Sequence, residues 1–335
     1  MDLTISHLLY GLFTLIIIVT MIFRKGVVLP SILGTFAIAL VYTGSLTKGF
    51  TAIFNANLVA ATELFSIFLI IMFMLALLHS LRDLGADEKM IRPIQKMMVN
   101  GHSSFFILVA VTYVISLFFW PTPAVPLICA LLVPAAIRSG LPAMTAAVAV
   151  ALAGQGMALS SDYIVQVAPS LSSAPADLNT ALVADYALIL SLISGGIAIL
   201  LAYFLYRKTL RNRDDERNEQ EALQIQAAES GNKKAATANL SKWGKIFAVF
   251  VPLSLLIVVI VMVYSKFASA ETGFVGGDGA AFVGGVAAML LLLSTIAFGK
   301  HHALDYISNH ITNGFVFAFK AMGPVIPIAG FFFLG

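Results

Sequence analysis

Residues 154–162 bring together the groups that are best suited to hold an ion or the polar end of a small solute. The stretch reads G-Q-G-M-A-L-S-S-D, with an amide at Gln155, hydroxyls at Ser160 and Ser161, and a carboxylate at Asp162. Hydroxyl and carboxylate oxygens can coordinate Na⁺, and backbone N–H groups at the start of a half-helix favour an anion. The stretch lies between apolar runs, so it predicts a polar site inside a membrane-spanning helix.

Asp162 is the most informative of these side chains. It is the first acidic residue after residues 105–161, a run whose only charged residue is Arg138. An ionisable group within a membrane is unfavourable by a few kcal/mol on insertion scales (roughly 2.5–3.5) and marks a functional position by default. One interpretation is that Asp162 alternately binds H⁺ or Na⁺. The other is that it caps the half-helix that follows, and the two are compatible. Ser160 and Ser161 have the same alternative, which is to satisfy backbone groups at the break.

The composition places these residues in a membrane protein. Of the 335 residues, 59% are hydrophobic and 11% are charged, and the net charge is +3. This predicts an all-α polytopic membrane protein of the cell membrane. The basic residues do not form a stripe interleaved with aromatic residues, which argues against a nucleic-acid partner. The single cysteine, Cys129, cannot form an intrachain disulfide and is expected to be a packing residue.

A second break precedes the first, within a helical hairpin at residues 105–138. Prolines at positions 121 and 123 interrupt an apolar run, and lipid cannot satisfy the backbone groups that such a break exposes. The arms are too short to span the bilayer comfortably, so we predict a re-entrant hairpin with its tip at Pro121-Thr122-Pro123-Ala124. The broken helix follows at residues 141–169. Two short spans are the alternative, because both arrangements return the chain to the same side.

The remaining apolar runs predict a repeated organisation. Two spans, an interfacial helix and a third span occur first at residues 7–23, 27–42, 45–61 and 62–81, and again at 246–264, 280–298, 300–313 and from 314. Residues 181–206 form another span. Residues 207–245 carry many charges and are interpreted as a solvated cytoplasmic linker with no chemistry of its own.

The two copies begin on opposite sides of the membrane, which is typical of an inverted-topology repeat. We assign residues 1–206 to the first repeat and 246–335 to the start of the second, which lacks a hairpin and a broken helix. We therefore expect the chain to be a fragment of a longer protein.

This order of elements resembles the ion transporter superfamily of secondary carriers, which includes citrate, gluconate and dicarboxylate permeases and some sodium/proton antiporters. The resemblance rests on three spans, the hairpin, the helix broken at residues 154–162, a further span, a linker and the repeat. It implies a site between hairpin tip and break, formed by the following residues: Thr122, Ala124, Gln155, Gly156, Ser160, Ser161 and Asp162. The chain departs from the better-known carboxylate carriers because it has no obvious Ser-Asn-Thr triplet, which does not favour a dicarboxylate. The resemblance also implies a homodimer.

Two functions follow from these expectations. The first is a secondary active transporter that moves a small organic solute, an anion by preference, together with H⁺ or Na⁺. The alternative is a sodium/proton antiporter without an organic substrate. We expect no cofactor and no enzyme activity, because the membrane portion has no paired nucleophile and base. No metal site is expected either, apart from Na⁺ at Ser160, Ser161 and Asp162. The adjacent His301 and His302 are not expected to bind a metal ion together, because neighbouring side chains on a helix point about 100° apart.

Overall fold

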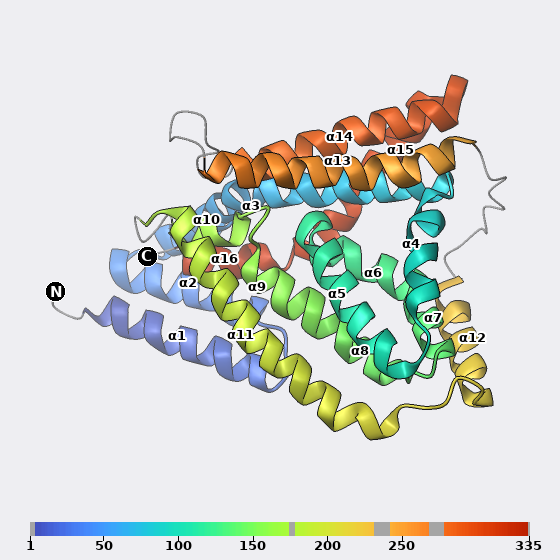
Figure 1. Ribbon diagram of the computed structural model, residues 1–335. Helices are drawn as coiled ribbons and strands as arrows, with labels where there is room; N and C mark the ends of the chain where they lie inside the picture. The colour runs from blue at the N-terminus through green and yellow to red at the C-terminus, as the bar shows by residue number, and fades with distance from the viewer. Residues whose placement is uncertain (1–3, 174–177, 231–241, 268–277, 334–335) are drawn as a thin grey trace. The chain divides into compact units, whose positions relative to one another are not determined.

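The computed structural model describes residues 4–173, 178–230, 242–267 and 278–333, and their regular structure is helical without a β-strand (Figure 1). In these residues seven helical segments are long and apolar enough to cross a membrane. They are Ile5–Ile22, Leu46–Asp83, Gly101–Phe119, Ala143–Ser161, Thr180–Thr209, Lys242–Met262 and Ala281–Met322. The all-α polytopic prediction is confirmed, and the chain is an integral membrane protein.

The chain divides into two compact units. The first comprises Met1–Leu69 and Phe315–Gly335, and the second comprises Ile70–Gly314. In the first unit α1 (Ile5–Ile22) packs on α2 (Val28–Thr43), and α2 packs on α16 (Val325–Phe332). The Tyr10 ring of α1 stacks on the Phe331 ring of α16, with centroids 5.1 Å apart, and Phe331 is fully buried. Aromatic packing therefore joins the two ends of the chain that make up this unit.

The expected division between an interfacial helix and the third span is wrong at both of its predicted positions. α3 runs unbroken through Leu46–Asp83, and α15 runs through Ala303–Met322. A new helix was expected to begin at Thr62. Its hydroxyl instead donates to the carbonyl of Leu58 one turn earlier (2.9 Å), as a threonine inside a helix does. Gly314 also lies within a helix. A Cβ there would clash with the carbonyl oxygen of Met72, so the glycine allows α15 to approach α3 closely.

The second unit holds the hairpin and the broken helix. After α3, the chain continues through α4 (Ala86–Met97), α5 (Gly101–Phe119), α6 (Pro121–Leu131), α7 (Val133–Arg138), α8 (Ala143–Val150), η1 (Ala151–Ala158), α9 (Leu159–Ser161), α10 (Val167–Ser173), α11 (Thr180–Tyr206), η2 (Arg207–Thr209), α12 (Glu216–Ser230), α13 (Lys242–Phe267), α14 (Asp278–Gly299) and η3 (Lys300–His302). The π-helix η1 packs against α5, α6, α8 and α11. These helices position the candidate site.

The hairpin turns at a single residue. α5 ends at Phe119, Trp120 takes a positive φ of 61°, and α6 begins at Pro121. Proline suits the first turn of a helix because the N–H that it lacks would have no intrahelical partner there. The turn therefore lies one residue before the predicted tip at residues 121–124, and Thr122 and Ala124 belong to the first turn of α6.

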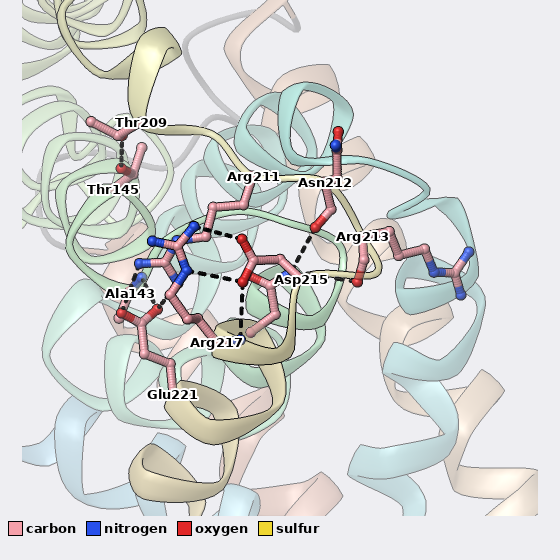
Figure 2. A network of polar contacts seen from close by, with 10 residues as sticks. Ala143, Thr145, Thr209, Arg211, Asn212, Arg213, Asp215, Arg217 and Glu221 are labelled. Carbon is pink, nitrogen blue, oxygen red and sulfur yellow. Dashed lines mark hydrogen bonds and ion pairs between the residues drawn. The ribbon is translucent and has the colours of Figure 1, made fainter.

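The charged linker is not merely solvated. Part of it forms α12, which packs against α7. The Arg211 N–H donates to the carbonyl of Gly140 (2.9 Å), and the Arg211 guanidinium forms two hydrogen bonds with Glu221 (3.0 and 3.2 Å) (Figure 2). Arg138 at the end of α7 pairs with Glu219 at 3.0 Å. Residues 207–230 are thus fixed to the base of the hairpin, and residues 231–241 lie outside the described part of the chain.

Candidate functional site

The helix after the hairpin changes its pitch before it ends. α8 continues directly into the π-helix η1, and then into the single turn α9. The expected interruption at Gly154 is therefore shifted, because Gly154 and Gly156 remain helical. The first non-helical residue is Asp162, with φ 33° and ψ 43°. A π-helix is rare and is found mostly as short insertions at functional positions. The segment is thus broken at Asp162 and locally widened just before it.

The Asp162 side chain connects the end of this helix to the start of the next. Its carboxylate oxygen Oδ2 accepts a hydrogen bond from the backbone N–H of Ala168 in the first turn of α10, at 2.7 Å. Only 4% of Asp162 is exposed. The capping interpretation is therefore confirmed, since one of the N–H groups that a helix start leaves unpaired is satisfied. Ion binding by the same carboxylate stays a prediction.

Three serine hydroxyls satisfy carbonyl groups where the helix widens. Ser160 donates to the hydroxyl of Ser191 on α11 (2.9 Å), and the carbonyl of Met157 also lies within hydrogen-bond distance of the same hydroxyl (3.2 Å). Ser191 donates in turn to Met157 (2.8 Å), and Ser161 donates to the carbonyl of Ala158 (3.3 Å). Because a hydroxyl oxygen has two acceptor positions, donation to the backbone leaves Ser160 and Ser161 able to accept or to coordinate.

The predicted site residues fall into two groups around the break. Ser161 and Asp162 are buried, whereas Gln155 and Gly156 lie on an exposed side of η1. Ser160 is exposed but is tied to α11 by its bond to Ser191. Hydrogen bonds therefore hold Ser160, Ser161 and Asp162 at the break.

The hairpin helix α6 contacts the broken helix through one close approach. A Cβ at Gly154 would lie 3.1 Å from Val125 Cγ2, one residue after Ala124. Ala124 is fully buried and Thr122 is half-buried. The hairpin helix and the π-helix thus contact each other, and the resemblance to secondary carriers implied a site between the hairpin tip and the broken helix. The assignment of Thr122 and Ala124 to a binding site stays a prediction.

Two hydroxyl residues that the sequence-based prediction missed also lie close to Gly154. Thr112 and Ser116 lie one turn apart on α5 and are buried. Thr112 Cγ2 and Ser116 Oγ would be 3.2 and 3.3 Å from a Cβ at Gly154. Among the described residues neither hydroxyl has a hydrogen-bond partner. Many serines and threonines in these helices donate to the carbonyl four residues earlier, as Thr35 does. The sequence could have indicated Thr112 and Ser116, because they are polar residues spaced four apart within an apolar span.

The described part of the chain contains no group of three or more histidine, cysteine, aspartate or glutamate side chains placed to hold a metal ion. The oxygens at the break are of another kind, with one carboxylate and the hydroxyls of Ser160 and Ser161. Such oxygens, together with carbonyls at a helix break, suit a monovalent cation in carriers. A Na⁺ site there stays a prediction.

Comparison with known proteins identifies relatives across nearly the whole chain. Residues 4–314 match the family model described as C4-dicarboxylate anaerobic carrier. The chain is 33% identical over 329 residues to an uncharacterized membrane protein, YhfA, of Bacillus subtilis (strain 168). That match covers 98% of this chain and 68% of the relative. No solved structure matches the chain.

Proposed function

We propose that this chain, which belongs to the C4-dicarboxylate anaerobic carrier family, moves a small dicarboxylate across the cell membrane in exchange or symport with H⁺ or Na⁺. The family match carries the substrate class. We give the family match over residues 4–314 more weight than the missing Ser-Asn-Thr triplet, because the match covers most of the chain. The wider membership in the ion transporter superfamily, the inverted repeat and the homodimer are parts of the same proposal.

The helix break is the position at which we expect the solute to bind. A carrier must hold its solute where the backbone has polar groups to offer, and in lipid such groups occur only at protected breaks. Here the break ends at the buried carboxylate of Asp162, beside the hydroxyls of Ser160 and Ser161. The hairpin helix α6 packs on η1 immediately before this point. We assign solute and ion binding to this junction.

Asp162 supports coupling to an ion. A carboxylate has about four acceptor positions, so the hydrogen bond from Ala168 does not by itself prevent Asp162 from binding H⁺ or Na⁺. Binding a cation there would reduce the repulsion between Asp162 and an anionic solute, which couples the two binding events. The same carboxylate without a solute would serve a sodium/proton antiporter. The two functions differ in whether ion movement requires an organic anion.

The test uses the full-length protein in liposomes that contain a pH-sensitive dye. Na⁺ is added first, followed by succinate, fumarate and malate in turn. Our proposal predicts a change in internal pH that appears only when a dicarboxylate is present. If Na⁺ is the coupling ion, it predicts that uptake of labelled succinate requires Na⁺. A pH change with Na⁺ alone would instead identify the antiporter. Liposomes without protein give the leak rate to be subtracted.

A further inference from the structure

A cavity of about 440 Å³ lies at the base of the hairpin, away from the helix-break residues that form the candidate site. Its lining includes Arg92 of α4, Arg138 of α7 and Arg213 of the segment between η2 and α12. Gln95 and Ser139 add polar groups, and none of the described residues that line it is acidic. The volume is in the range of small-molecule sites, which is about 300–1,000 Å³. Three guanidinium groups from three separate segments therefore share one cavity.

Two of the three arginines have no acidic partner among the residues that the structure describes. Among the described residues, Arg92 and Arg213 form no ion pair, whereas Arg138 pairs with Glu219 at 3.0 Å. Both Arg92 and Arg213 are exposed. Guanidinium groups repel one another unless an anion lies between them, and their planar donors match carboxylate and phosphate oxygens. The lining thus has an excess of positive charge in the form best suited to a multiply charged anion.

The segment that carries Arg213 is held in place by its neighbours. Asn218 donates from its side-chain amide to the carbonyl of Asn212 (2.8 Å), and the Arg217 guanidinium donates to the Asp215 carboxylate (2.7 Å). Arg211 is fixed at both its backbone and its side chain by its bonds to Gly140 and Glu221. Figure 2 shows the Arg213 side chain extending away from this network and not joining it. The local hydrogen bonds therefore preorganise the backbone and leave the Arg213 guanidinium available.

We propose that this cavity binds a multiply charged anion through Arg92, Arg138 and Arg213. The ligand carries carboxylate or phosphate groups, and it can come from solution or from the headgroup of an anionic lipid. Arg138 ends α7, so an anion bound here contacts the base of the hairpin directly. The site holds a ligand independently of whether the chain transports dicarboxylates.

The test measures binding to the full-length protein in phosphatidylcholine nanodiscs by titration calorimetry. Inorganic phosphate and succinate are the soluble probes. The variant R92Q/R213Q removes the two charges that have no acidic partner in the described part of the chain. The control K96Q/K208Q removes two exposed charges from α4 and η2 that do not line the cavity. We expect at least tenfold weaker binding of one probe in R92Q/R213Q and a change below twofold in the control. Succinate held at a transport site would persist in both variants.

The lipid source is examined by native mass spectrometry after reconstitution with phosphatidylglycerol. Lipid retention that R92Q/R213Q abolishes and the control preserves would support the same site with a headgroup as its ligand. Equal retention and equal probe binding in wild type and R92Q/R213Q would overturn the proposal, as would the absence of both. Size-exclusion profiles and thermal unfolding of each variant show that loss of binding does not reflect loss of fold.

Discussion

Replacing Gly154 with alanine tests whether the hairpin and the π-helix pack as closely as the structure shows. The new methyl group would lie 3.1 Å from Val125 Cγ2, 3.2 Å from Thr112 Cγ2 and 3.3 Å from Ser116 Oγ. These atoms belong to two helices, α5 and α6, so both must give way at once. At Gly156, two residues later in the same π-helix, an added Cβ meets only the carbonyl of Ala151, at 3.7 Å. Gly156→Ala is therefore a matched control.

The difference between the two variants isolates the steric effect. Alanine favours a helix over glycine by about 1 kcal/mol, and this gain applies to both positions. Overpacking a close contact reduces stability by about 1–3 kcal/mol. We therefore expect Gly154→Ala to be less stable than Gly156→Ala by about 1–3 kcal/mol. In a chain of this size that difference corresponds to about 2–6 °C in Tm, at roughly 2 °C for each kcal/mol.

Thermal unfolding of both variants in one detergent, followed by intrinsic fluorescence, measures the difference. Gly156→Ala should match or exceed the wild type, because its methyl group makes only an ordinary van der Waals contact. If Gly154→Ala unfolds at the same temperature as Gly156→Ala or above it, the close approach of α5 and α6 to η1 is wrong. The contact assigned to the candidate site would then have to be abandoned.

Three further predictions concern single side chains. Asp162→Asn keeps an oxygen that can accept a hydrogen bond from Ala168, so thermal stability should change little. Uptake driven by a pH or Na⁺ gradient should be lost, and unchanged gradient-driven uptake would remove the coupling role of Asp162. Thr112→Val removes a buried hydroxyl that has no partner among the described residues, so unfolding should show equal or greater stability, and a clear loss would mean that the hydroxyl is bonded. A side-chain hydrogen bond from Arg217 lowers the pKa of Asp215 from 3.8 to about 2. Because the folded-state pKa is depressed, the stabilisation is present above about pH 4 and disappears as the pH falls through about 2, so wild type and Asp215→Asn should differ at pH 7 and converge at pH 2.

Long apolar runs were predictable because their length alone determines that they span a bilayer. The expected spans at residues 7–23 and 181–206 agree with α1 and α11 to within two residues. The break was located to the right region but not to the right residue. Glycine lowers helix propensity, yet Gly154 stays helical because its missing side chain admits α5 and α6. The sequence shows that glycine is a weak helix former, but only the packing shows whether the helix is interrupted at that glycine.

The contacts made by distant segments could not be predicted from the sequence. A charged linker is normally solvated, and the docking of α12 on α7 depends on ion pairs such as Arg138–Glu219 that join residues 81 positions apart. The same holds for Ser191, whose hydroxyl completes the polar cluster at Ser160 from another helix. Each side chain was visible in the sequence, but the partner that gives it a role was not.

Counterflow of labelled succinate shows whether this protein carries C4 dicarboxylates. Liposomes that contain the full-length protein are loaded with unlabelled succinate and diluted into buffer with a trace of labelled succinate, without any ion gradient. A carrier for dicarboxylates predicts a transient accumulation of label inside the liposomes, which unlabelled fumarate suppresses and which Asp162→Asn retains. If no C4 dicarboxylate produces counterflow while Na⁺ alone changes the internal pH, dicarboxylate transport by this protein is contradicted.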